Sequence, residues 1–438
     1  MALNAAVIWE VRSTGNDLNG GGFKVGAAGT DYSQQNNAQK SGADLTMHAT
    51  TNTKVSPVAA KVAAADVGNL IYIASGTNWT AGFYEITAQD GGDPGYWTLD
   101  RSPNAAGDAN LGTYKMGGGL ASPGLVSAAA VGSNIAFIKY GSYSITSATP
   151  SIAGGCIAGW SYGLVCGYDT TRTVSNQDAN RPTLTLAAEV SSATMVAVSS
   201  RRLILDGAGN TSSRGCSALV EGCSGSNFTN SAFNSWAFNC HATGCSAVVA
   251  FASLAVGCTA TGNSIASFGS YSFHCLAWAN TATPFYSSSA PACIYCSAYG
   301  NTGATTDGFY TLSSSGSIFL GCISEANGRY GFHGGATSYK QHYAINCAHY
   351  NNTSVGVYGV AVEIGTITLT GSPFVDAVNA NFALNNTAGA GAACRAAGYP
   401  ATFPLGLTAS YRDIGAAQHA DPAGGGGGFP ILGGSVVR

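Results

Sequence analysis

A five-residue spacing between a Cys and an Asn recurs in the second half of the chain and constrains the fold more than any other feature. Successive Cys positions lie 17, 21, 26 and 25 residues apart. The five pairs are Cys258 with Asn263, Cys275 with Asn280, Cys296 with Asn301, Cys322 with Asn327, and Cys347 with Asn352. Asp376 with Asn381 keeps the offset, with Asp in place of Cys. An irregular period of this length indicates a solenoid whose coils differ in loop length.

The residues around each pair repeat as well. A short β segment ends in a bend at Asn, and an aromatic residue often follows, as at Phe268, Phe285, Phe309 and Phe332. Asn tolerates the left-handed backbone of a sharp bend, and its amide can bond to the amide of the next coil. Cys is a small apolar filler for a narrow core, and aromatic rings can stack between coils. The repeat therefore predicts internal ladders of Cys, Asn and Phe, with Asp376 in a structural ladder position.

The first part of the chain has a different texture. The runs "NLIYIASG" (69–76), "GFYEITA" (82–88) and "YWTLDR" (96–101) are separated by Gly, Asp and Pro, which predicts a small antiparallel β module. With 60 Gly and only 9% charged residues, the composition suits tightly turning β structure and not helices.

Several segments together resemble one known class of protein. "GCISEANGRYGF" (321–332) and its relatives look like the repeat of right-handed parallel β-helix proteins of the pectate-lyase-like architecture. "WEVRSTGNDLNGGGF" (9–23) is similar to the opening of such proteins, "SPGLVSAAAVGSNIAFIKYGSYSI" (122–145) to their first cap and coil, and "YRDIGAAQH" (411–419) to their last coil. With the inserted module and the ending "GGGGGFPILGGSVVR", the chain most resembles β-helix proteins of tailed bacteriophages.

The resemblance and the texture divide the chain into four parts. Residues 1–23 form the first β-helix strand, 24–119 an inserted β module, 120–420 the right-handed parallel β-helix, and 421–438 a Gly-rich linker with an apolar arm. At about 20 to 25 residues per coil, the β-helix would have about a dozen coils. The arm residues expected to bind a neighbouring subunit or virion protein, or else to form a disordered end, are Phe429, Ile431, Leu432, Val436 and Val437.

Charge and targeting signals exclude several classes of partner. The net charge is −3, and no basic cluster exceeds Arg201 with Arg202, so we expect no nucleic-acid binding. The N-terminus lacks the pattern of a secretory signal, and no apolar run is long enough for a membrane span. The 13 Cys are therefore interpreted as reduced, buried thiols of a protein assembled in the host cytoplasm.

Some of the Cys residues could belong to a metal site or a disulfide instead of a ladder. Cys293 and Cys296 with His274 are the sharpest metal candidate, but a zinc site usually needs a second such pair, and Cys296 already belongs to the repeat. Cys240 and Cys245 could form a disulfide, although their odd spacing keeps them off one strand face. We expect neither a metal nor a cofactor.

A catalytic groove would need paired carboxylates or a Ca²⁺ site. Between Cys216 and Ala390 the acidic residues are Glu221, Asp307, Glu325, Glu363 and Asp376, with no DxD or DD pattern. The densest polar set is Glu325, Arg329, His333, Lys340, His342 and His349. If a groove exists, Glu325 is the candidate acid or base, and Arg329 and His333 orient the substrate. Otherwise these are solvated loop residues on the outside of the coil.

These observations favour a non-enzymatic structural virion protein displayed on the capsid or tail as a decoration, spike or fibre component. The resemblance implies a homotrimer that contacts other virion proteins. One alternative is a tailspike-like depolymerase, either a polysaccharide lyase or a glycoside hydrolase. Another is a non-catalytic adhesin that binds a host surface glycan through Trp236, Trp278, Tyr299 and Tyr330.

Overall fold

The computed structural model describes residues 3, 6–92, 95–104, 110–123, 135–145, 164–173, 180–187, 194–196, 199–210, 213–246, 249–287, 292–312, 316–335, 342–395, 397–398 and 413–418. The chain forms two compact units, Met1–Ala208 and Gly209–Arg438, and each is described by itself.

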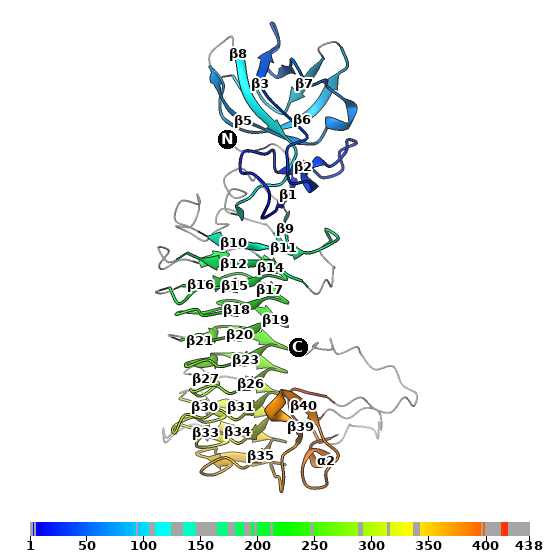
Figure 1. Cartoon of the computed structure of the whole chain (residues 1–438). Coiled ribbons are helices and arrows are strands. Elements are labelled where there is room, and N and C mark those ends of the chain that lie inside the picture. The colour runs from blue at the N-terminus through cyan, green and yellow to red at the C-terminus, as the bar shows by residue number, and fades with distance from the viewer. Residues whose placement is uncertain are drawn as a thin grey trace, which may run out of the picture. The chain divides into compact units, whose positions relative to one another are not determined.

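The first unit contains a closed antiparallel barrel with the strand order β3-β4-β7-β6-β5-β8 (Figure 1). Its strands are β3 (Lys40–Met47), β4 (Lys54–Pro57), β5 (Leu70–Thr77), β6 (Gly82–Asp90), β7 (Tyr96–Leu99) and β8 (Asn110–Met116). Alternate residues such as Ile71, Ile73 and Trp97 point inward and are buried, as expected for strands with one face toward a core. The predicted antiparallel β module is therefore confirmed, and its sheet closes on itself.

The remaining strands of this unit form mostly parallel sheets. One runs in the order β2 (Gly22–Lys24), β1 (Val7–Val11), β9 (Ile135–Lys139), β11 (Leu164–Tyr168), β14 (Ser199–Arg201). Another runs β10 (Ser142–Ile145), β12 (Thr183–Leu186), β15 (Ile204–Asp206). Strand β1 is antiparallel to β2 and parallel to β9, so the opening of the chain joins the parallel sheet.

A buried carboxylate links three segments of the first unit. Glu10 is fully buried and accepts a hydrogen bond from Arg12 Nε to its Oε1 at 2.8 Å. Arg172 Nη1 lies 3.3 Å from Glu10 Oε2, and the same guanidinium pairs with Asp31. Burial raises the pKa of Glu10 in spite of the hydrogen bond from Tyr168 and the two arginines. This network holds β1, the 31–33 turn and the end of β11 together.

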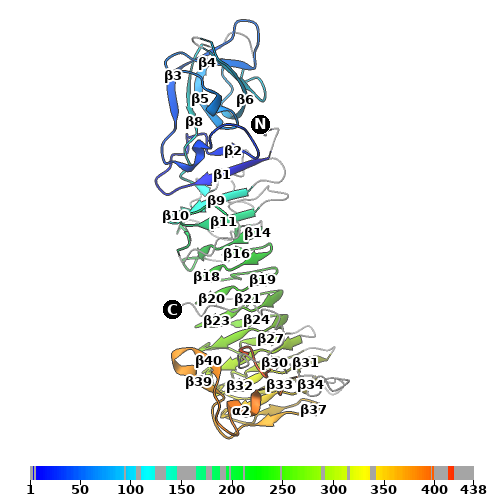
Figure 2. The ribbon, with the colours of Figure 1, turned by 90° about the vertical axis from the view of Figure 1, so that its right-hand side faces the viewer.

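The second unit is a parallel β-helix. From β19 to β36, each turn of the chain adds one strand to each of three sheets, and neighbouring strands within a sheet are parallel (Figure 2). Sheet 1 contains β17 (Val220–Glu221), β19 (Ala237–Phe238), β22 (Leu254–Val256), β25 (Tyr271–Phe273), β28 (Ala292–Ile294), β31 (Ser317–Leu320), β34 (His342–Ile345) and β37 (Val362–Ile364). The right-handed sense that the resemblance implies stays a prediction.

The other two sheets complete each coil. Sheet 2 contains β18 (Ser224–Ser226), β20 (His241–Thr243), β23 (Thr259–Thr261), β26 (Leu276–Trp278), β29 (Ser297–Tyr299), β32 (Ile323–Glu325), β35 (Ala348–Tyr350) and β38 (Ile367–Thr368). Sheet 3 contains β21 (Val249–Phe251), β24 (Ala266–Phe268), β27 (Phe285–Ser287), β30 (Phe309–Thr311), β33 (Phe332–Gly334) and β36 (Val357–Tyr358). Most of these strands are two to four residues long, so successive bends of a coil lie close together along the chain.

The offset of five between Cys and Asn follows from two left-handed bends on either side of a sheet 2 strand. A residue with φ near +50 to +65° precedes the Cys, three strand residues follow it, and a second left-handed residue precedes the Asn. The residues before the Asn are Gly262, Ala279, Gly300, Ala326 and Asn351. The ladder Asn itself is not left-handed, so the predicted backbone role of Asn belongs to the residue before it.

These bends allow a test of backbone strain. Ala326 and Gly300 occupy equivalent bends in adjacent coils, with φ of 53° and 57°. A left-handed conformation costs an L residue about 1 kcal/mol relative to Gly. We expect Ala326→Gly to raise the free energy of unfolding by about 1 kcal/mol in urea titration. Gly300→Ala, whose added Cβ would meet no atom within 4 Å, should lower it similarly; a loss from both changes would contradict the strain account.

The side chains of the ladder Asn form a buried hydrogen-bonded column. Asn280 Oδ1 accepts from the backbone N of Asn263 at 3.0 Å and from its Nδ2 at 3.1 Å. The same pattern continues from Asn280 to Asn301, from Asn301 to Asn327, and from Asn327 to Asn352. At the other end, Asn263 Oδ1 accepts from the backbone N of Cys245 at 2.9 Å. Each amide therefore satisfies a bend in the preceding coil.

Two apolar columns fill the core beside the amides. Cys258, Cys275, Cys296, Cys322 and Cys347 are fully buried, and each thiol donates to a carbonyl of the preceding coil at 3.2 to 3.4 Å. Burial raises the pKa of the Cys258 thiol. Phe251, Phe268, Phe285, Phe309 and Phe332 stack with ring centroids 4.6 to 4.9 Å apart. Phe251, and Phe233 stacked on it at 5.2 Å, extend this column two coils beyond the predicted four.

The end of the second unit departs from the expected β-helix. The last parallel strand in the described part is β38, not a coil near residue 420. Strands β39 (Phe374–Asp376) and β40 (Asn381–Leu384) then form an antiparallel hairpin around the turn η5 (Ala377–Asn379), followed by α2 (Gly391–Cys394) (Figure 2). Asp376 pairs with Asn381 across this hairpin and caps η5. The ladder position predicted for Asp376 is therefore wrong, because its segment has left the coil.

This C-terminal segment packs on the outer face of sheet 2 from β26 to β38. Phe374, Phe382, Leu384 and Ile414 form one apolar cluster with Ile323 and Ala348 of the sheet. Gly415 N donates to Gly321 O at 2.7 Å and Ala416 N to Ser297 Oγ at 3.0 Å. The 413–418 part of the predicted last coil therefore lies on the outside of the coils. Phe429, Ile431, Leu432, Val436 and Val437 lie outside the described residues.

Candidate functional site

The outer face of sheet 3 carries a row of aromatic side chains. Phe285, Phe309 and Phe332 point into the core, so the next residue of each strand points outward. These outward residues are Tyr286, Tyr310 and His333, and Tyr358 follows in register on β36. Tyr310 and His333 stack with ring centroids 4.4 Å apart. The local signal is thus an aromatic residue or histidine directly after Phe285, Phe309 and Phe332, whereas Phe251 and Phe268 are followed by Ala and Gly.

A buried carboxylate lies behind this row. Asp307, fully buried before β30, accepts from Arg329 Nε to Oδ1 at 2.8 Å and from Arg329 Nη2 to Oδ2 at 2.6 Å. His333 Nδ1 lies 2.7 Å from Asp307 Oδ2, and the backbone N of Tyr330 lies 3.1 Å from Oδ1. One carboxylate therefore orients the side chains of two residues in the next coil.

Burial and hydrogen bonding together decide whether the Asp307 carboxyl is ionised. Burial alone would raise the pKa of Asp307, but the hydrogen bonds from Arg329 and His333 hold that pKa below its usual value. The ionised carboxylate of Asp307 accepts a hydrogen bond from a protonated Nδ1 of His333. Arg329 Nη2 lies 3.1 Å from that nitrogen and donates to the same Asp307 Oδ2. Nε2 of a neutral His333 is then the ring nitrogen that can accept a proton or hydrogen bond.

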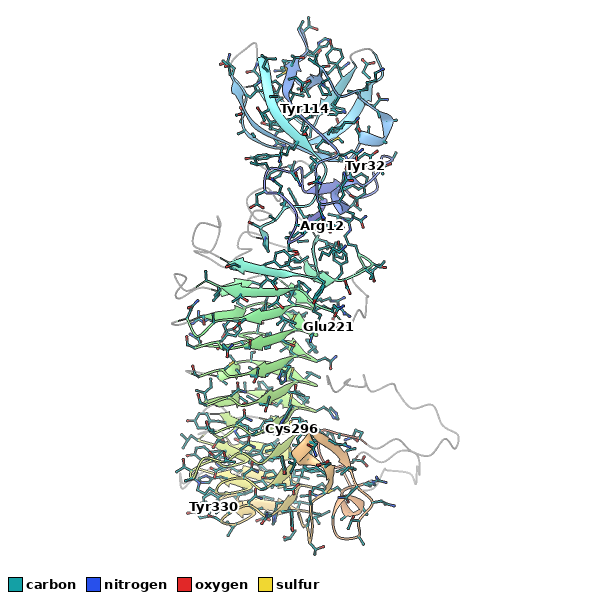
Figure 3. All side chains as sticks on the ribbon, viewed as in Figure 1. Arg12, Tyr32, Tyr114, Glu221, Cys296 and Tyr330 are labelled. Carbon is teal, nitrogen blue, oxygen red and sulfur yellow. The ribbon has the colours of Figure 1, made fainter. Side chains whose placement is uncertain are left out.

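Further rings close the site around His333. Tyr330 meets His333 edge to face at 4.9 Å and stacks on Tyr358 at 4.5 Å. The guanidinium of Arg329 lies 4.9 Å from the centre of the Tyr330 ring. Tyr330 lies at the outer edge of the coils (Figure 3). We call this group the Tyr/His site; it comprises Tyr286, Asp307, Tyr310, Arg329, Tyr330, His333 and Tyr358.

The arrangement is suited to holding a flat ligand with polar edges. Tyrosine rings offer apolar faces with hydroxyl groups at their tips. Arg329 is partly exposed, and its Nη1 is not used in the bonds to Asp307, so it can donate to a ligand hydroxyl or carboxylate. The only carboxylate of the Tyr/His site is Asp307, which is engaged by Arg329 and His333.

Glu325 does not belong to this site. It ends β32 in sheet 2, is 4% exposed, and accepts a hydrogen bond from Ser372 Oγ at 3.1 Å under the C-terminal segment. Burial raises the pKa of Glu325 to about 7. The structure therefore brings Arg329 and His333 together and places Glu325 on another face, contrary to the predicted groove and to the alternative of a solvated loop residue.

The other predicted site residues have separate environments. His342 is buried in β34, and His349 lies next to Thr368, with Nε2 3.2 Å from its Oγ1; Lys340 lies outside the described residues. Trp278 and Tyr299 pack against Phe382 beneath the C-terminal segment. They therefore offer no open stacking surface.

The cysteines do not assemble a metal site in the described part of the chain. Cys240, Cys245, Cys293 and Cys296 are free and buried, and His274 stacks on Tyr295. Cys245 takes the ladder position that Asn occupies in later coils, which explains its offset from Cys240. No group of three or more His, Cys, Asp or Glu among the described residues could hold a metal, and no described helix is long and apolar enough to cross a membrane.

Sequence reasoning missed Asp307, Tyr286, Tyr310 and Tyr358 as partners of Arg329 and His333. Aligning Phe309 with Phe332 would have placed Tyr310 beside His333, and Asp307 opposite Tyr330 and one residue from Arg329. The signal was therefore present in the register of the Phe column and not in any carboxylate pattern.

No known protein family matches the chain in sequence, and no curated protein does either. Among solved structures, the A-module of mannuronan C-5 epimerase AlgE4 from Azotobacter vinelandii is 14% identical, with a TM-score of 0.33 over 58% of this chain and 77% of that one. ORF18 of Geobacillus virus E2 is 10% identical, with a TM-score of 0.26 over 54% of each chain. A rhamnogalacturonan lyase is 14% identical, with a TM-score of 0.24 over 58% of this chain and 70% of that one. Likenesses at these scores carry no conclusion about function.

Proposed function

We propose that this protein is a structural attachment component of a tailed-phage particle, whose β-helix displays a binding site for a host surface polysaccharide. The observation that carries the binding part is the row Tyr286, Tyr310, His333 and Tyr358, in register across four strands of sheet 3. The strand spacing of about 4.8 Å is close to the length of one hexose. The partly exposed Tyr286 and Tyr310 and the exposed Tyr358 can therefore meet sugars of one chain, whereas His333, 8% exposed, lies between them.

The place of the protein in a virion rests on the sequence resemblance. A homotrimeric decoration, spike or fibre on the capsid or tail is the form that this resemblance supports. Imaging of intact particles with a label on this chain tests it. Density on a capsid lattice or tail is the expected result, and absence of the chain from purified particles would overturn the virion assignment.

Binding is favoured over hydrolysis by the carboxylates of the site. A hydrolase needs two carboxyl groups flanking the scissile bond, whereas Asp307 is the only one in the Tyr/His site and is buried beneath Arg329 and His333. Glu325, the other candidate, is covered by the C-terminal segment. The site therefore has stacking surfaces and donors but lacks the pair that cleavage with water requires.

The binding proposal predicts a loss of affinity when the rings are removed. We expect Tyr310→Ala and Tyr358→Ala each to weaken binding to the host polysaccharide about 10-fold, since an aromatic contact contributes about 1 kcal/mol beyond the area it buries. Calorimetric titration of the full chain with purified host glycan measures this. Tyr140→Ala, an exposed tyrosine of the first unit, is the matched control and should bind normally. Unchanged affinity in both site variants would refute the assignment.

A lyase is the second candidate, because Asp307 orients His333 as a base. In β-elimination, Nε2 would remove the C5 proton next to the carboxylate of a uronic acid, and the electron pair of that C–H bond would form the C4=C5 double bond. The glycosidic oxygen on C4 would leave with its bonding electron pair and take a proton from solvent. Arg329 Nη1 could hold the substrate carboxylate. Wild-type protein that generates an unsaturated sugar, seen by ultraviolet absorbance and lost in His333→Gln, would support this candidate. Binding without such a product would support the adhesin.

A further inference from the structure

The outer face of sheet 1 is apolar across successive coils. On each strand the middle residue points inward, as Ala255, Ser272 and Phe319 show by their burial, so the two flanking residues point outward. One outward column includes Tyr271, Ile318 and Tyr343, and the other includes Phe273, Leu320 and Ile345. We call this surface the sheet 1 face.

Charge is excluded from the length of this surface. Between Phe238 of β19 and Ile345 of β34, the outward positions of the sheet 1 strands carry no Asp, Glu, Lys or Arg. At one end, Glu221 of β17 lies in an outward column, in register with Phe238. At the other end, Glu363 of β37 is in register with the inward Ala344 and is exposed in the last strand of the sheet. Tyr271 is 48% exposed, Ile318 43% and Ile364 53%. Solvated sheet faces normally alternate with polar residues, so this surface lacks the composition of one that remains in water.

The other two outer faces of the β-helix differ from it. Sheet 2 is also apolar outside from β26 onward, at Leu276, Ile323 and Ile367, but there the C-terminal segment covers it. Sheet 3 carries the polar Tyr/His site. Among the described residues, the C-terminal segment thus covers the apolar face of sheet 2, whereas the sheet 1 face is exposed.

We propose that the sheet 1 face is the surface through which copies of this chain associate with one another. A second copy fits for two reasons. A face without charges can meet its own duplicate without like-charge repulsion. Side chains on strands about 4.8 Å apart form regular ridges, and two such sheets can interdigitate about 10 Å apart.

The area of the sheet 1 face sets the expected strength of association between two copies. From β19 to β37, strand spacing gives a length of about 29 Å, and three residues give a width of about 10 Å. The flat area is about 290 Å² per copy, or about 580 Å² per pair, which lies below the range of stable specific interfaces and predicts weak association. Association should therefore depend on concentration. Packing of one face against its own duplicate gives a two-fold pair, so this inference concerns a contact between two copies in addition to the homotrimer of the proposed function, and it does not depend on glycan binding.

Sedimentation velocity of the full chain over a range of concentrations tests the inference. We expect the wild type to associate, and Ile318→Glu to weaken association by at least about 100-fold, because each copy would bury an unpaired charge. Val378→Glu is the matched control: Val378 is 84% exposed on η5, away from the sheet 1 face, and the change should leave association intact. Equal thermal unfolding of the two variants shows that both fold.

Two results would overturn the inference. A wild type that stays monomeric at all concentrations would mean that the face is free or is covered by residues of the same chain, such as the apolar arm. Association that persists in Ile318→Glu would place the interface elsewhere. Glycan titration of the same samples separates this outcome from the proposed function. If Tyr310→Ala leaves glycan affinity unchanged while the copies still associate, only the binding site is refuted.

Discussion

Replacing Asn301 by alanine is expected to lower the free energy of unfolding by about 3 kcal/mol, since two buried donors lose their acceptor at about 1 to 3 kcal/mol each. Asn301 Oδ1 accepts from the backbone N of Asn280 at 3.0 Å and from its Nδ2 at 2.9 Å. Asn301 Nδ2 also donates to Asn327 Oδ1 at 2.7 Å. All three residues are fully buried, so water cannot replace the missing partner. Urea unfolding monitored by circular dichroism measures the loss.

Asn381 provides the matched control for this experiment. It has the same offset from an upstream Asp376 as the ladder Asn has from Cys, but it lies exposed in the hairpin. Asn381→Ala should change the unfolding free energy by less than about 0.5 kcal/mol. Comparable losses from Asn301→Ala and Asn381→Ala would show that the buried amide column does not stabilise the coils.

The second unit should lose stability as pH rises from about 4.5 to 7, because of Glu325. Burial raises the pKa of this carboxyl from 4.5 to about 7 in the folded protein, so between these values the folded state binds more protons than the unfolded state. The stabilisation is fully present below pH 4.5 and is lost as pH passes 7. The shift corresponds to about 3 kcal/mol. The expected consequence is a looser C-terminal segment at neutral pH.

Glu325→Gln isolates this contribution from the other groups that titrate in the same range. A neutral amide can still accept the hydrogen bond from Ser372. The variant should equal the wild type in melting temperature near pH 4 and exceed it at pH 8 by several degrees. Hydrogen exchange in β39 and β40 should slow in the variant at pH 8. A wild type and variant that differ equally at both pH values would contradict a buried, neutral Glu325.

The repeat was the part of the fold that could be read in advance. Cys and Asn recur because each coil must place a small apolar group and an amide at fixed points beside two bends, and that requirement leaves the same offset in every coil. The backbone conformation that produces this offset was harder to predict from the sequence. Left-handed bends fall on Ala279, Tyr295 and Ala326 as well as on Gly, and nothing in those residue types marks such a conformation.

The Tyr/His site could be predicted only in part. Arg329 and His333 lie close in sequence, so they were recognised together. Asp307 comes from the preceding coil and reaches them through strand pairing, and its distance along the chain hides the contact. Glu325 lies only four residues before Arg329, yet a left-handed bend at Ala326 separates them and places them on different faces.

The parallel coils, their core ladders and the antiparallel module could be predicted from the chain alone, because these depend on local patterns that repeat or alternate along it. What covers each outer face became known from the packing of distant segments. Whether an outward side chain is solvated, buried or part of a site depends on segments distant in sequence, as the C-terminal segment over Glu325 and Trp278 shows. The physical reason is that burial is a property of what packs against a residue, and local pattern records only which way the residue points.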